Sequence, residues 1–361
     1  MKEARISVAM ATYNGERFLQ EQLDSLARQT LLPCELVVCD DGSTDGTLDI
    51  LHRFASKAPF PVRIHQNEER LGHGRNFLRA ASLCSGELIA FCDQDDVWLD
   101  HKLERCADLF SEAGCVLVIH SGQVVDESLK PLGRRTPSAR RTTCLDAENS
   151  LGWHSLSSRL GMSPGFACVF RSNLLGQVPP APPLVSPGRG HEYWLLFAAE
   201  VTGSVALVPD VLVLYRQHGN NTAGFRARPN GGLRSVFETG DAEYTRQAED
   251  AGARAVLLAD AAERSPELRL RLTKAQRWYE MRAKSLACRA SLYGQASSLR
   301  ETARRLISMV LSGTYGRRNR GGLGIWSLAK DCHRAFFPPG PPKASGGQPG
   351  ELRRPLEGES R

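Results

Sequence analysis

Residues 88–98 have the sequence LIAFCDQDDVW, in which an unbroken apolar run leads directly into clustered acidic side chains. The apolar run predicts a buried strand. Because side chains alternate along a strand, Asp93 and Asp95 are expected to project to one side while Asp96 turns away. Carboxylates this close repel one another unless a cation neutralises them, and hard oxygen ligands suit Mg²⁺ or Mn²⁺. This strand end therefore predicts a site for a divalent metal and a diphosphate.

A second stretch upstream repeats this design. Residues 35–47 have the sequence ELVVCDDGSTDGT, where an apolar strand runs into Asp40 and Asp41 and then into a helix that Thr44 or Asp45 can cap. In open α/β sheets, ligands bind beyond the carboxyl ends of the strands. The two acidic clusters can therefore face one crevice, although they lie far apart in the sequence.

The turn after the first strand is the third feature of this kind. Residues 6–15 have the sequence ISVAMATYNG, which lacks the Gly-x-Gly-x-x-Gly of a dinucleotide site and so disfavours NAD binding. Tyr13 offers a ring on which a base can stack, and Thr12 and Asn14 offer hydrogen bonds. Taken alone, the segment fits an ordinary turn capped by Asn14 better than a binding loop.

The wider pattern predicts an α/β fold. From residue 6 to about residue 121, short apolar strands alternate with helical periods, which is typical of a mainly parallel sheet with helices on its faces. Residues 130–159 are polar and irregular, so we expect a long loop or lid there. Residues 205–215 predict a hairpin or strand pair around a central Pro-Asp pair, and residues 240–336 have the apolar spacing of helices. The other predicted strands cover residues 6–11, 35–39, 62–65, 87–92, 115–120 and 165–171, and the main predicted helices cover 16–28, 75–83 and 192–201.

The composition is that of a globular chain. It has 361 residues, 41% of them hydrophobic, a formal net charge of +6 and a pI near 8.8, and this mild charge gives no reason to expect a nucleic-acid partner. The ten cysteines form no Cys-x-x-Cys pair, so we expect buried free thiols. No secretory signal opens the chain, and polar residues break its longest apolar stretch, residues 194–215. These features predict a cytoplasmic protein.

Two other kinds of site fit the acidic clusters less well. An aspartyl-phosphatase motif requires Asp-x-Asp after a strand, which residues 40–41 do not supply. Asp93 and Asp95 do have that spacing, but a phosphohydrolase would not need the separate upstream cluster. A calcium loop would need a downstream Glu where the sequence has Leu51 and His52.

Three motifs in this order resemble those of the family 2 glycosyltransferases of the GT-A fold. They are SVAMATYNG at residues 7–15, DDGS at 40–43 and DQDD at 93–96. The longer string CDQDDVW most resembles the rhamnosyltransferase-like members, which build bacterial surface polysaccharides. The resemblance implies a GT-A domain at residues 1–230, with a mixed, mainly parallel sheet flanked by helices. The sequence pattern adds a C-terminal helical extension at 231–337 and a disordered Pro/Gly-rich tail at 338–361.

The resemblance also implies a role for each motif residue. Asp93 would contact the ribose, and Arg75 would approach the donor phosphates or base. Asp95 and Asp96 would bind the metal. The residues that would bind the donor are Thr12, Tyr13, Asn14, Asp40, Asp41, Arg75 and Asp93.

Two later segments extend the resemblance. HEYWL at residues 191–195 resembles the segment that carries the catalytic base, where many relatives have His-Asp-Trp-Trp and this chain has Glu192 in the base position. YRQHGNN at residues 215–221 resembles the closing motif of the subgroup, whose histidine, here His218, can complete the ligand set of the metal.

The implied activity is an inverting glycosyl transfer that depends on Mg²⁺ or Mn²⁺, with Glu192 removing the proton of the acceptor hydroxyl. The donor would be dTDP-L-rhamnose or a UDP-sugar, and the acceptor a glycan or lipid-linked glycan in cell-surface polysaccharide synthesis. The basic C-terminal helices would either cap the catalytic domain or rest on anionic lipid at the inner face of the plasma membrane. The alternative is a non-catalytic sugar-nucleotide or glycan-binding protein on the same fold.

Overall fold

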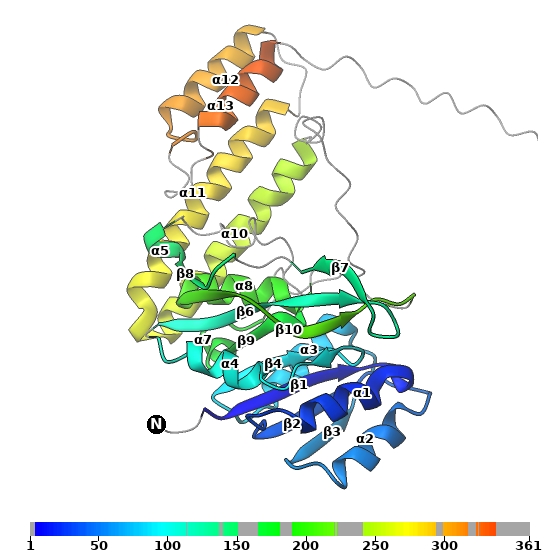
Figure 1. Cartoon of the computed structure of the whole chain (residues 1–361). Coiled ribbons are helices and arrows are strands. Elements are labelled where there is room, and N and C mark those ends of the chain that lie inside the picture. The colour runs from blue at the N-terminus through cyan, green and yellow to red at the C-terminus, as the bar shows by residue number, and fades with distance from the viewer. Residues whose placement is uncertain are drawn as a thin grey trace, which may run out of the picture.

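The computed structural model of the chain describes residues 4–112, 114–136, 140–150, 165–180, 190–219, 221, 241–293, 299–316, 323 and 325–336. The predicted domain boundary at residue 230 and the predicted tail at 338–361 lie outside these residues. Figure 1 shows one mixed sheet with helices packed around it and a stack of long helices extending from one side.

The N-terminal half of the sheet consists of parallel strands. Their order is β3-β2-β1-β4, with β1 at Ile6–Thr12, β2 at Glu35–Asp40, β3 at Val62–Gln66 and β4 at Leu88–Cys92. Every residue of β1, β2 and β4 is buried, as expected for parallel strands covered on both faces. Because these three strands are neighbours and run the same way, their carboxyl ends meet at one edge, as the acidic motifs predicted.

The helices that follow the first three strands are amphipathic and cover this half of the sheet. They are α1 at Glu16–Ala27, α2 at Thr47–Ala55 and α3 at His73–Ser82. Helix α1 packs against α2, whereas α3 packs on β1 and β2 and also contacts α8, which spans His191–Thr202. The α3–α8 contact brings the segment after β3 next to the segment that carries Glu192.

The second half of the sheet mixes directions. Strand β9 (Cys168–Arg171) runs antiparallel between β4 and β6 (Cys115–Val125), and β10 (Ser204–Arg216) pairs parallel to β6. The short strand β5 (Val97–Trp98), which directly follows the acidic motif, pairs antiparallel with β10. This pairing matters for the site, because it places residues 93–96 beside the segment that follows β10.

Two predictions for the middle of the chain were wrong. The predicted loop at residues 130–159 contains strands β7 (Pro131–Arg135) and β8 (Thr143–Asp146) and the short helix α5 (Ala147–Ser150). All five residues of β7 are exposed, so it has no buried face of the kind that marks a strand. It pairs with β6 through the backbone and through Gln123 Nε2, which donates to the carbonyl of Arg134 at 2.8 Å. Residues 151–164 lie outside the described part of the chain.

The predicted hairpin at residues 205–215 is instead one long strand. Strand β10 continues through Pro209 and Asp210, and its register against β6 shifts between Leu207 and Val211. A bulge of this kind accommodates a proline, which cannot donate a ladder hydrogen bond, without ending the strand.

The remaining helices carry the chain away from the sheet. Helices α10 (Asp241–Arg264) and α11 (Arg269–Tyr293) pack side by side, and their buried residues, among them Leu258 and Leu272, join the main hydrophobic core. Helices α12 (Leu299–Leu311) and α13 (Ile325–Phe336) lie at the far end of the stack in Figure 1. Short helices also occur at α4 (Lys102–Leu109) and α7 (Leu174–Gln177). Within the described residues, we find no helix with the length and apolar character needed to cross a bilayer.

Candidate active site

The carboxyl ends of β1, β2 and β4 are tied together by side chains of the three motifs. Thr12 Oγ1 donates to Asp40 Oδ2 at 2.7 Å, which joins the first motif to the second. The first motif is joined to the third by Gln94, whose Oε1 accepts from Tyr13 N at 2.9 Å and whose Nε2 donates to Tyr13 O at 3.1 Å. Asn14 has a φ of 47°, and its Oδ1 accepts from Thr44 N at 2.8 Å. The three predicted motifs therefore lie side by side at one edge of the sheet.

Asp40 and Asp41 use much of their hydrogen-bonding capacity on the protein itself. Asp40 is fully buried and accepts from the backbone N–H groups of Gly42 and Ser43 at 3.1 and 2.8 Å, as well as from Thr12. Asp41 accepts the backbone N–H groups of Leu71 and Gly72 at 2.7 and 2.8 Å. In the protein alone they hold the loops that shape the site, and their contact with the donor stays a prediction.

Tyr13, Asn14 and Arg75 are the exposed residues among those predicted to bind the donor. Tyr13 is 38% exposed, and the guanidinium carbon of Arg70 lies 3.8 Å from its ring centroid. Arg70 was missed by the sequence analysis, because only the fold brings it over the ring. Arg75 lies exposed on α3, and its approach to a donor stays a prediction.

The acidic motif holds carboxyl groups whose charges are crowded. Desolvation raises the pKa of Asp93 well above its usual range, and the charges of Asp95 and Glu192 raise it further. Burial also raises the pKa of Asp96, with added repulsion from Asp95 and Asp93. Asp96 Oδ1 accepts from Arg216 N at 2.9 Å, but its buried Oδ2 has no partner among the described residues. A cation would relieve this repulsion.

His218 lies beside the acidic motif. Its Nε2 is 2.8 Å from Asp95 Oδ2, and Asn221 Nδ2 donates to the same oxygen at 3.4 Å. The Asp95 carboxylate oxygen and the His218 imidazole nitrogen, 2.8 Å apart, are donor types that a divalent cation accepts. The residues present therefore fit a metal such as Mn²⁺ or Mg²⁺.

Two buried cations near this motif were not found from the sequence. Arg216, only 1% exposed, donates from Nε to the carbonyl of Asp95 at 2.8 Å and from Nη2 to Glu21 Oε2 at 2.5 Å. Lys102 is fully buried, and its Nζ donates to the carbonyl of Phe166 at 2.7 Å. Burial lowers the pKa of Lys102 to about 8. The position of Arg216 within the YRQHGNN segment at residues 215–221 is the one sequence signal that points to it.

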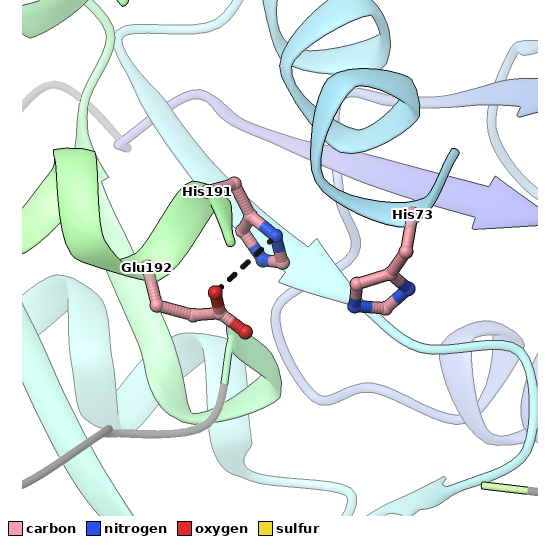
Figure 2. Close-up of side chains that lie close together, drawn as sticks. All are labelled: His73, His191 and Glu192. Atoms are coloured by element: carbon pink, nitrogen blue, oxygen red, sulfur yellow. Dashed lines mark ion pairs between the residues drawn. The ribbon is translucent and has the colours of Figure 1, made fainter. Parts of the chain in front are cut away.

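Glu192 lies in the first turn of α8. Its side chain is 16% exposed, and burial raises its pKa, which suits a group that must accept a proton. The same turn carries His191, whose fully buried ring stacks on Phe77 with centroids 4.3 Å apart and meets Phe91 edge-on at 4.5 Å. His191 Nδ1 lies 3.7 Å from Glu192 Oε2. Figure 2 marks this contact with a dashed line.

The base segment and the acidic motif lie within electrostatic reach of the same carboxyl group. The charges of Asp95 and Glu192 both raise the pKa of Asp93, so both lie within electrostatic reach of that carboxyl. They also act together on His73 at the start of α3. That these residues form a single site stays a prediction.

Comparisons with known proteins bear on the family and the fold. Residues 7–177 match the family model described as glycosyl transferase family 2. An uncharacterized glycosyltransferase of Nostoc sp. (strain PCC 7120) is 28% identical over 218 residues, which cover 60% of this chain and 66% of that protein. The dTDP-rhamnosyl transferase RfbG of Shigella flexneri is 29% identical over 229 residues, covering 60% of this chain and 73% of that protein. The chain thus spans slightly less than two thirds of the Nostoc protein.

A solved structure supports the fold. The crystal structure of S. aureus TarS 1–349 in complex with UDP-GlcNAc superposes with a TM-score of 0.50 at 21% identity, covering 87% of this chain and 93% of that one. The family and fold predicted from the three motifs are therefore confirmed. Residues 7–177 thus match glycosyltransferase family 2, and this part of the chain has the GT-A fold.

Proposed function

We propose that the chain transfers a sugar from a nucleoside diphosphate donor to an acceptor hydroxyl with inversion at the anomeric carbon, assisted by a divalent metal. The observation that carries this proposal is the Asp95–His218 contact at 2.8 Å, with Glu192 within electrostatic reach of the same acidic motif. Such a reaction needs a group that binds the metal and a general base close to it.

Asp95, His218 and the unpartnered oxygen of Asp96 would hold Mg²⁺ or Mn²⁺. When bound, the ion supplies Lewis-acid stabilisation of the charge on the leaving diphosphate. Tyr13 would stack on the base of the donor, and Thr12, Asn14 and Asp41 would line the nucleoside site. Arg216 holds the acidic motif in place through the Asp95 carbonyl, so it acts as a positioning residue.

Glu192 would act as the general base. Its carboxylate takes the proton of the acceptor hydroxyl while that oxygen attacks the anomeric carbon from the face opposite the diphosphate. Burial makes this carboxylate a stronger base than an exposed glutamate, because the raised pKa favours the protonated form that it must reach in the transition state.

We propose dTDP-L-rhamnose as the donor and a UDP-sugar as the alternative. The first follows from the name of the Shigella relative and from the motif resemblance, the second from the UDP-GlcNAc bound to TarS. Incubation of the full chain with Mn²⁺ and a panel of donors, read out as nucleoside diphosphate release, would identify the preferred one.

Glu192→Gln tests the mechanism. The variant is expected to lose transfer while its thermal stabilisation by Mn²⁺ and the preferred donor stays close to that of the native chain. Loss of that stabilisation would show that Glu192 binds the donor instead. Donor binding by the native chain without any turnover would favour the non-catalytic alternative.

We also propose that α12 rests on anionic lipid and brings the site to a lipid-linked glycan acceptor. Ile307 and Leu311 are 61% and 82% exposed, and Arg300 and Arg304 are exposed on the same helix. An exposed apolar stripe beside basic residues suits a membrane surface. Flotation with anionic vesicles, but not neutral ones, is expected. An Ile307→Ser/Leu311→Ser variant that floats as well as the native chain would count against this contact.

A further inference from the structure

A cluster of metal-ligating side chains lies beside the proposed base. His73 at the start of α3 and His191 and Glu192 at the start of α8 each offer one ligand atom, and these atoms lie within 4.8 Å of one another. Figure 2 shows the His191 ring between the Glu192 carboxylate and the His73 ring. The two helix starts meet here because α3 packs against α8.

The buried imidazole of this cluster lacks the partners that burial demands. His191 is fully buried, and neither ring nitrogen has a hydrogen-bond partner among the described residues. Buried polar groups are nearly always satisfied, and an unseen ion is one accepted explanation for an exception. The ring is also fixed, because it stacks on Phe77 and its Nε2 faces Gly165, where a Cβ would lie 2.2 Å away. Its Nδ1 faces Glu192 instead, at 3.7 Å.

We propose that His73, His191 and Glu192 form a second cation site that takes Zn²⁺, distinct from the Mg²⁺ or Mn²⁺ site at Asp95 and His218. Two imidazoles and one carboxylate are a common zinc ligand set that leaves a fourth position open to water. Imidazole ligands favour zinc over magnesium, whereas the carboxylates of the acidic motif favour the harder ions. Zinc bonds of about 2.0–2.2 Å place tetrahedral donors roughly 3.4 Å apart. The ligand atoms now lie up to 4.8 Å apart, and side-chain movement of the exposed His73 and the partly exposed Glu192 can bring them to the shorter spacing around the fixed His191.

Zinc at this site would occupy the carboxylate of Glu192 and so stop it from accepting a proton. This consequence rests on the proposed function of Glu192, whereas the binding of zinc does not. The site would then act as an inhibitory switch that responds to zinc without competing for the donor metal.

Direct binding tests the site without any assay of activity. The full chain with Cys144→Ser, which removes an exposed thiol, is titrated with Zn²⁺ against a chromophoric chelator, and with Co²⁺ as a spectroscopic probe. His73→Gln is expected to weaken zinc binding at least about tenfold and to remove the Co²⁺ absorption of a site with nitrogen ligands. His52→Gln, on the exposed face of α2, serves as the matched control and should bind as the parent does.

The position of the ion is tested with a second variant. Asp95→Asn should leave zinc binding nearly unchanged if the ion lies at His73, and should abolish it if the ion lies at the donor metal site. Zinc binding that survives His73→Gln, or that is lost in Asp95→Asn, overturns the proposal.

Measuring sugar transfer as well as zinc binding distinguishes failure of the zinc site from failure of the proposed function. An active chain whose Mn²⁺-dependent transfer is inhibited by zinc, with inhibition relieved in His73→Gln, supports both. A chain that transfers sugar and does not bind zinc overturns the zinc site alone. A chain that binds zinc through His73 and transfers no sugar supports the site and overturns the proposed function.

Discussion

His218 Nε2 lies 2.8 Å from Asp95 Oδ2, although the two residues are 123 positions apart in the sequence. The sheet explains the contact, because β5 follows the acidic motif and pairs antiparallel with β10, which ends just before His218. Val97 pairs with Leu214 and Trp98 with Val213, so the segment that precedes β5 runs beside the segment that follows β10, and this brings the two side chains within contact. Folding, rather than proximity in the sequence, therefore brings His218 next to the acidic motif.

Replacing His218 by Gln should weaken Mn²⁺ binding by about 10- to 100-fold in the presence of a nucleoside diphosphate, because one metal ligand and the orientation of Asp95 are lost together. Isothermal titration of the full chain measures this effect. His101→Gln, at an exposed position before α4, should bind as the native chain does. Unchanged Mn²⁺ affinity in His218→Gln would remove His218 from the ligand set.

Gly15 and Gln94 provide a test of how the strand ends are held together. A Cβ at residue 15 would lie 2.4 Å from Gln94 Oε1, so Gly15→Ala must displace the side chain that bonds both the N–H and the carbonyl of Tyr13. The cost is expected to be about 1–3 kcal/mol of unfolding free energy, measured by urea denaturation.

A double-mutant cycle checks the cause of that loss. Gln94→Ala alone removes the same two hydrogen bonds, so adding it to Gly15→Ala should cost much less than it costs in the native chain. Additive costs would mean that Gly15 is needed for its backbone and that Gln94 is not the residue it accommodates.

Gly165 is expected to be intolerant of any side chain. A Cβ there would lie 2.2 Å from His191 Nε2, and the ring cannot retreat because Phe77 and Phe91 enclose it. Gly165→Ala should therefore destabilise the fold by about 1–3 kcal/mol, the usual cost of overpacking. Gly176→Ala is the matched control, since no atom lies within 4 Å of its added Cβ. Equal melting temperatures for the two variants would contradict the close packing at His191.

Local signals account for the part of the site that could be predicted from the sequence. Apolar runs that end in Asp40 and Asp93 mark strand ends, and parallel strands bring such ends together. The role of Gln94 in joining two strand ends could not be predicted from local signals, because its partner Tyr13 lies 81 positions away and glutamine is an ordinary turn residue. Strand β7 was missed because all its residues are exposed.

The roles of Glu192 and His218 were available only through the family resemblance. Nothing in residues 191–195 or 215–221 shows by itself that they approach residues 93–96. His73 has no local signal at all, because it begins a helix in a polar segment and meets His191 only where α3 packs on α8. Contacts of this kind depend on tertiary geometry and lie beyond a reading of one sequence.

Replacing Asp96 by Asn should change the melting temperature in opposite directions with and without bound metal. The pKa of Asp96 in the fold is well above the value of 3.8 for an ordinary aspartate, because the group is buried among like charges. The folded chain therefore binds this proton more tightly than the unfolded chain does. The contribution of Asp96 to the free energy of unfolding is most favourable at pH values below its pKa in the unfolded chain. This contribution declines as the pH rises from about 4 to its pKa in the folded chain.

Replacing Asp96 by Asn removes that charge and keeps an oxygen that can accept from Arg216 N, the bond that Asp96 Oδ1 now makes at 2.9 Å. Without metal at pH 7.5, the variant should melt at a higher temperature than the native chain, and the difference should shrink toward pH 4. With saturating Mn²⁺ and a nucleoside diphosphate the order should reverse, because the native carboxylate then faces a cation and the neutral amide is the poorer ligand. A variant that melts lower under both conditions would mean that Asp96 is needed for the fold rather than for the metal, and the ligand set would then contract to Asp95 and His218.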